Sequence, residues 1–83
     1  MEDTDIVIRG MKLTKTKLFT DLDIPHFCAS IQNQHMSIAE RNSMRNILKK
    51  QDDKKAFIDA LVQHLISFAE GIAASIVASF NMP

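Results

Sequence analysis

The feature that most constrains this fold is the long apolar segment at the end of the chain, from Ala56 to Phe80. Apolar side chains recur there at alternating steps of four and three residues, which is the spacing of a helix-packing seam: Ile58, Val62, Leu65, Ala69, Ile72 and Ile76. The spacing predicts one long helix over this segment. Its seam should pack against another helix.

The apolar arc of this predicted helix spans roughly 200°, about twice what a surface helix needs to cover one core. Each buried large apolar side chain contributes about 1.5–3 kcal/mol, so leaving half of the arc exposed would lose on the order of 10 kcal/mol. We therefore predict a homodimer, with an interface formed by Phe57, Ile58, Leu61, Val62, Leu65, Phe68, Ala69, Ile72, Ile76 and Phe80. Two alternatives stay open: the preceding helices fold back and cover the arc, or a different protein supplies the partner helix.

Two shorter helices are predicted before this segment. Asp23 offers an N-terminal cap for a helix from about Ile24 to Gln34, with Pro25 in its first turn, where the missing N–H costs nothing. The apolar positions of this helix follow helical spacing: Ile24, Phe27, Cys28 and Ile31.

The next helix has the sharpest start signal in the chain. Ser37 and Glu40 have the spacing of a capping box, in which the hydroxyl accepts from the N–H three residues on and the carboxylate reaches back. We predict a helix from Ile38 to about Lys50, with an apolar side formed by Ile38, Met44, Ile47 and Leu48. Asp52 or Asp53 should then cap the long helix.

Residues 1–22 are predicted to be an N-terminal arm or a short strand. Ile6 to Ile8 is a β-favouring run closed by Gly10, and Met11 to Leu18 alternates only loosely, so a helical turn near Leu18 competes with a strand. Met1 to Thr4 should be disordered. The fold class is therefore all-α with at most one short strand: residues 23–83 form a three-helix dimerisation domain, with the long last helix in a dimeric bundle.

Composition places the chain in a broad class without naming an activity. Ten basic and ten acidic residues give zero net charge, so no global field draws the protein to nucleic acid or anionic lipid. The single Cys28 and an acidic N-terminus without a signal-peptide pattern favour the cytoplasm. The apolar run from Leu61 to Phe80 approaches spanning length, but His64 and Glu70 interrupt it, so no membrane span is expected.

Catalytic and metal-binding motifs do not stand out. Structural zinc sites present paired ligands, and this pattern is not met by the one close set of candidate ligands, His26, Cys28 and His35. We interpret Cys28 as a small core residue and predict no metal and no cofactor. His64 lies at the border of the apolar arc, and Glu70 and Asp59 lie too far round the helix to pair with it. The sequence therefore predicts a protein that is not an enzyme.

A local basic face is the strongest electrostatic feature. The segment 41–55 carries six cations against two acids, and three of the cations recur every four residues: Arg41, Arg45, Lys49, Lys50, Lys54 and Lys55. Such a stripe is often only a solvated face, but it can also contact a partner or lie on phosphates.

We interpret the chain as a small regulatory or adaptor protein that acts through helix-mediated homodimerisation and binding to a protein partner. The arm and the basic face would be its contact surfaces. The alternative is a dimeric DNA-binding transcriptional regulator that uses the same basic face, with a paired ribbon presenting Lys12, Thr14 and Thr16. A helix-turn-helix fits less well, because polar residues occupy positions that should be buried: Gln32, Gln34 and Asn42. Binding to a membrane surface is a further alternative, although the polar face of the long helix lacks the cations typical of it.

Overall fold

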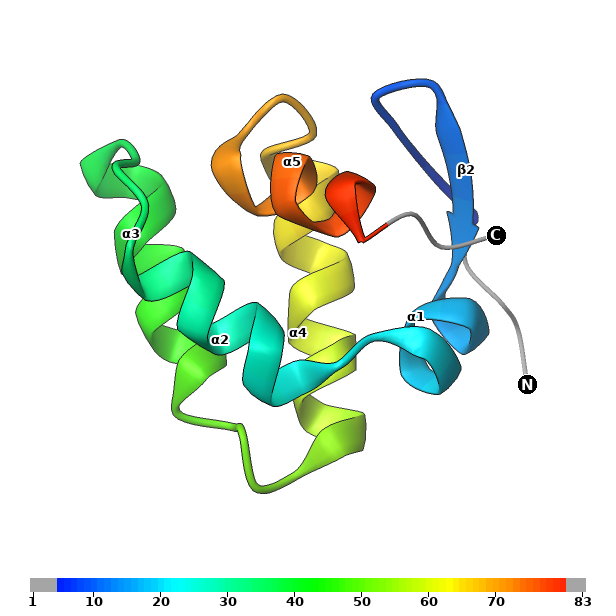
Figure 1. The fold of residues 1–83 in the computed structure, drawn as a ribbon, viewed down its shortest axis with the longest axis horizontal. Coiled ribbons are helices and arrows are strands. Elements are labelled where there is room, and N and C mark those ends of the chain that lie inside the picture. Colours follow the sequence, from blue (N-terminus) through cyan, green and yellow to red (C-terminus); the bar gives the residue numbers. More distant parts are fainter. Residues whose placement is uncertain (1–4, 81–83) are drawn as a thin grey trace.

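The computed structural model describes residues 5–80. Within this range the chain forms a two-stranded hairpin and five helices (Figure 1): β1 (Asp5–Ile8), β2 (Met11–Thr14), α1 (Lys15–Asp21), α2 (Ile24–Gln32), α3 (Ile38–Leu48), α4 (Lys54–Ser67) and α5 (Ile72–Ser79). The predicted helical class is confirmed, but the three-helix count is wrong for the described part, and a second strand is present. The disorder predicted for Met1 to Thr4 falls outside the described residues.

The N-terminal segment pairs with itself. β1 and β2 are antiparallel with Ile8 opposite Met11, which leaves Arg9 and Gly10 as a two-residue turn. Both turn residues have positive φ, 49° for Arg9 and 78° for Gly10, as a hairpin turn matched to the right-handed strand twist requires. Alternate side chains then face the core, so Ile6 and Ile8 are buried.

The predicted helix starts are confirmed by their caps. Asp23 Oδ1 accepts from the His26 N–H at 3.1 Å, and Asp53 Oδ1 accepts from the Ala56 N–H at 3.1 Å. Ser37 Oγ accepts from the Glu40 N–H at 3.1 Å, which confirms one half of the predicted capping box. These signals were readable because donor and acceptor lie three residues apart.

The single long C-terminal helix is wrong. α4 ends at Ser67, α5 begins at Ile72, and the chain bends by 115° between them. Phe68 leaves the helical conformation with φ −124° and ψ 53°, and Gly71 stands at the start of α5 with no side chain to cap it. No single helix within residues 5–80 is long and apolar enough to cross a membrane, and α4 with α5 meets that criterion only as this bent pair.

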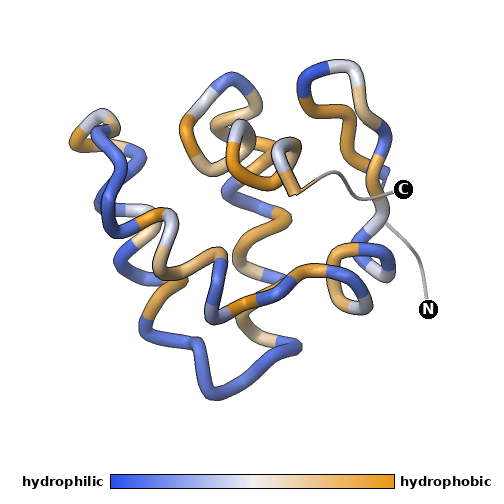
Figure 2. Tube along the Cα trace, viewed as in Figure 1, coloured by the Kyte–Doolittle hydropathy of each residue, from blue (hydrophilic) through white to orange (hydrophobic). Residues whose placement is uncertain are grey.

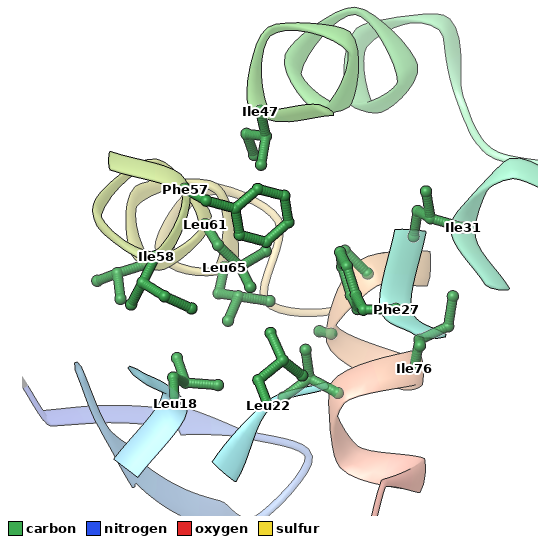
Figure 3. Packing of buried hydrophobic residues seen from close by; sticks show 14 of the residues in the cluster. Leu18, Leu22, Phe27, Ile31, Ile47, Phe57, Ile58, Leu61, Leu65 and Ile76 are labelled. Carbon is green, nitrogen blue, oxygen red and sulfur yellow. The ribbon is translucent and has the colours of Figure 1, made fainter. Parts of the chain in front are cut away.

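The core surrounds α4. α1, α3 and β1 pack against α4, while α5 packs against α2 (Figure 1). Figure 3 shows the side chains that meet there, among them Ile47 of α3, Phe27 of α2 and Ile76 of α5. The Phe27 ring meets the ring of Phe57 edge-on, at 6.1 Å between centroids. One apolar cluster therefore joins all five helices and the hairpin.

The reason for predicting a dimer is corrected by this packing. Six of the ten predicted interface residues are buried within the single chain: Phe57, Ile58, Leu61, Val62, Leu65 and Ile76. The other four are half-buried: Ala69, Ile72 and Phe80 pack against the same core, and Phe68 stacks on the ring of His64. The wide apolar arc does need two neighbours, but the same chain supplies them: α1 with β1, and α3. The homodimer therefore stays a prediction, but the surplus apolar surface that motivated it is absent from the described chain. The domain boundary at residue 22 also stays a prediction.

Candidate functional site

The carboxylate of Glu40 joins three helices in the interior. Glu40 is 3% exposed. Its Oε1 accepts from the Ile72 N–H at 3.1 Å, and its Oε2 accepts from the Ala73 N–H at 3.0 Å. Ile72 and Ala73 open α5, so a residue of α3 satisfies N–H groups that the start of a helix leaves unpaired, at the end where negative charge is favoured.

Gly71 makes room for this carboxylate. A Cβ atom at position 71 would lie 2.7 Å from both carboxylate oxygens of Glu40, closer than carbon and oxygen atoms approach in real structures. The absence of a side chain therefore lets the start of α5 approach Glu40 closely. The break between α4 and α5 thus lies where Glu40 meets Gly71 and the two N–H groups behind it.

The other half of the predicted capping box is wrong, because the Glu40 carboxylate binds the start of α5 instead of the start of its own helix. We expected the Glu40 carboxylate to reach back to the start of α3. It points into the core instead, where it meets two N–H groups of α5 and the ring of His64. A buried carboxylate needs several donors, and the interior offers three, whereas the exposed start of α3 offers water.

His64 of α4 continues the chain of polar contacts. Its Nε2 lies 3.0 Å from Glu40 Oε2, and its Nδ1 lies 2.7 Å from Ser43 Oγ. An ionised carboxylate only accepts, so His64 donates its Nε2–H to Glu40, and its Nδ1 shares a second hydrogen bond with the Ser43 hydroxyl. The ring is 2% exposed and stacks on Phe68 at 4.7 Å. The expectation of a histidine at the border of the arc without an acidic partner is wrong, because the acid comes from α3.

The electrostatics keep Glu40 charged. Burial on its own raises the pKa of Glu40, but the hydrogen bonds from the Ala73 N–H, from His64 and from the Ile72 N–H, together with the charge of a protonated His64, lower the pKa below its ordinary value. Donors aimed at the ionised form thus outweigh the loss of solvation. Glu40 is therefore ionised at neutral pH.

The order Ser43, His64, Glu40 is the order of groups that activates a serine in hydrolases. The surroundings differ from those of a nucleophile. Ser43 lies in the interior of α3, His64 is 2% exposed, and the groove that Glu40 borders is lined by neither of them. The geometry fits a polar network that fixes α3, α4 and α5 relative to one another.

The groove beside Glu40 is open and partly apolar. Its volume is about 670 Å³, and it lies between the segment 35–37, before α3, and the segment 66–72, around the break. Ile66, which is 50% exposed, lines it together with Met36 and Phe68. Charged and polar side chains on the rim include His35 and Glu70.

The predicted basic face lies on the surface of α3, on the connection to α4 and on the first turn of α4. Its six cations, Arg41, Arg45, Lys49, Lys50, Lys54 and Lys55, are exposed except for Arg41, which is half-exposed and donates to the Gln34 carbonyl. Figure 2 shows the hydrophilic stretch from the end of α3 to the start of α4. The ion pairs found within residues 5–80 join Lys15 to Asp59, Lys17 to Asp21 and His64 to Glu40, and none includes a cation of the basic face.

Ile38 adds an apolar side chain to this surface. We predicted Ile38 on the buried side of α3, but it is 81% exposed. It stands three residues before Arg41 and seven before Arg45, so it shares their side of the helix. The buried side consists of Glu40, Met44 and Ile47.

The remaining candidates occupy separate places. Cys28 is buried in the core, as predicted, and burial raises the pKa of its thiol. The ring of His26 stacks on Phe80 at 5.1 Å. Within residues 5–80 there is no group of three or more His, Cys, Asp or Glu side chains that could hold a metal ion.

The ribbon considered for DNA binding is not formed as predicted. Lys12 lies exposed on β2, and the Thr14 hydroxyl accepts from the Lys17 N–H and caps α1. Thr16 lies within α1. The three side chains therefore do not project together from one strand.

Similarity to known proteins adds no evidence on the groove beside Glu40 or on the basic face. Comparison with protein-family models, with curated proteins and with solved structures finds no match to this chain. A function has to be argued from the geometry and charge of the chain's own residues.

Proposed function

We propose that this chain is a small, non-enzymatic binding protein that docks the exposed face of α3 onto an acidic surface of a protein partner. One observation carries the proposal: the highly exposed Ile38 lies in line with Arg41, Arg45 and Lys49 on the side of α3 that faces away from the core. A regulatory or adaptor role is the use that suits such a surface.

The spacing matches a known mode of recognition. Helices that bind in a groove present their contact residues at steps of three and four, and positions 38, 41, 45 and 49 follow these steps. An apolar residue at the start of the row, followed by cations, suits a partner with a small apolar pocket flanked by carboxylates. Phosphates alone would match the cations but leave the isoleucine without a partner.

The charge distribution supports an acidic partner. Several acidic side chains are already engaged elsewhere: Asp21 and Asp59 in ion pairs, Asp23 and Asp53 as helix caps, and Glu40 in the core. Zero net charge thus divides into a locally positive surface on α3 and its connection to α4. Such surfaces speed the approach of oppositely charged partners and help to select among them.

Selection from a random peptide library tests the proposal, with the wild-type protein as bait. We expect enriched peptides in which Asp or Glu flanks an apolar residue. Binding should fall at least about tenfold in Ile38→Ala and in the pair Arg45→Glu and Lys49→Glu. Lys12→Glu is the matched control, because Lys12 is exposed on β2 outside the basic face. Equal binding by Ile38→Ala and wild type would overturn the proposed docking face.

The second candidate is DNA binding, favoured by the six cations of segment 41–55 that lack ion pairs among the described residues. Contacts to several phosphates make affinity fall steeply with salt. Retention of duplex DNA at low salt, lost in the Arg45 and Lys49 double variant but kept in Ile38→Ala, would identify this function instead. The predicted homodimer is not part of either test.

A further inference from the structure

We propose that α5 is an exchangeable element. When Glu40 releases the start of α5, residues 68–71 become helical, α4 and α5 straighten into one helix, and two copies of the chain swap their α5 helices. The proposal rests on the juxtaposition of the Glu40 carboxylate with Gly71 at a break that the helical pattern crosses without interruption.

The sequence across the break is suited to a helix. The apolar steps of four and three continue through it, from Leu65 to Ala69 to Ile72. The segment 68–71 is Phe-Ala-Glu-Gly, so Gly71 is its one residue of poor helix propensity and proline is absent from it. Apart from Gly71, the local sequence therefore favours a helix, and the contacts of the break with Glu40 of α3 oppose one.

The hydrogen bonds of the break have partners in both states. In the bent chain the N–H groups of Ile72 and Ala73 donate to Glu40. In a straight helix each would donate four residues back, to the carbonyls of Phe68 and Ala69. Straightening thus replaces these two bonds, and the Glu40 carboxylate loses two of its donors.

In a single copy, a straight helix would remove the side chains of α5 from the core. Ala73, Ala74 and Val77 of α5 are fully buried in the bent chain, where α5 packs against α2. Straightening moves these side chains into water and leaves the site on α2 empty. A second copy has the same empty site, so each α5 can enter the core of the other copy, with the contacts of the single chain re-formed around a two-fold axis.

The exchange also adds contacts at the hinge. Phe68, Ala69 and Ile72 are only half-buried at the break. In a swapped dimer the two straightened hinge segments run past one another, which brings these side chains of one copy against those of the second copy. The occupant of the opened site is therefore a second copy of this chain.

Gly71→Ala tests the exchange, because an alanine Cβ would meet the Glu40 carboxylate in the bent form but favours a straight helix. We expect Gly71→Ala to show twice the monomer mass in light scattering and a higher helical content by circular dichroism. Adding Ala69→Pro should restore the monomer. Position 69 is the second residue of the turn closed by the Gly71 N–H and the Phe68 carbonyl, where proline is favoured, and proline there blocks a continuous helix.

A folded, monomeric Gly71→Ala protein would overturn the proposal, and so would a dimer that Ala69→Pro does not affect, since its assembly would not need the straight helix. If Gly71→Ala does not fold, wild type and Ala69→Pro are each refolded from urea at high protein concentration. Dimer in the wild type alone supports the exchange, and monomer in both contradicts it.

Discussion

Glu40 and His64 lie 24 residues apart in the chain, yet their side chains meet at 3.0 Å in the interior. The contact joins α3 to α4, and the other bonds of the same carboxylate join α3 to α5. A single acidic side chain thus ties the start of α5 to α3 and α4.

Acid should destabilise the protein through Glu40. Because hydrogen bonds hold the pKa of Glu40 below its ordinary value in the folded state, the ionised carboxylate stabilises the fold at neutral pH. This contribution is lost as the pH falls through the lowered pKa. Urea unfolding between about pH 7 and pH 3 should show a falling free energy of unfolding, and Glu40→Gln should reduce the slope. Parallel pH profiles for the two proteins would contradict the assignment.

Glu40→Ala should be strongly destabilising. It leaves the N–H groups of Ile72 and Ala73 and the ring of His64 without their acceptor in a buried place. Removing one partner of such a network costs about 3–5 kcal/mol. Glu70→Ala is the control, because Glu70 is exposed and should change stability by less than about 0.5 kcal/mol. Chemical denaturation measures both, and equal losses would argue against the network.

Ser43 should not behave as an activated nucleophile. Its hydroxyl shares a hydrogen bond with a histidine that is almost fully buried, and neither residue lines the groove next to Glu40. Incubation with a fluorophosphonate, followed by mass spectrometry, should leave Ser43 unmodified. Labelling of Ser43 that disappears in His64→Ala would instead assign hydrolase chemistry to this network.

Leu65→Ala should destabilise the single chain directly. Leu65 is fully buried in the core around α4, and truncating such a leucine costs about 2–5 kcal/mol.

For a monomer the unfolding midpoint is independent of protein concentration, whereas for an obligate dimer it rises with concentration. Thermal unfolding at two well-separated concentrations distinguishes these cases. A concentration-dependent midpoint in the wild type would support the predicted homodimer.

Local signals made much of this fold predictable. The caps by Asp23, Ser37 and Asp53 join atoms three residues apart, so each appears in the sequence as a short motif. The cap of α5 does not appear in this way, because Glu40 lies 32 residues before Ile72. A glutamate three residues after a serine looks the same whether it caps its own helix or another. The wide apolar arc correctly indicated two neighbours for α4 but carried no information on whether the same chain provides them.

The candidate surface and the buried network were also predictable only in part. The basic face was predictable from the spacing of Arg41, Arg45 and Lys49. Ile38 was assigned to the core because it is apolar, although its position on the helix places it with Arg41 and Arg45. The network of Ser43, His64 and Glu40 was missed because its members come from two helices, and no spacing within one helix joins them.

Because Cys28 is buried, the reactivity of its thiol reports local opening of the native structure. It is the one thiol in the sequence, and it is 3% exposed in α2, the helix against which α5 packs. An alkylating reagent can reach it only when the surrounding structure opens, so the rate of alkylation measures the free energy of that opening. Detachment of α5 should therefore be observable in unlabelled wild-type protein, as a thiol that reacts before the rest of the fold is lost.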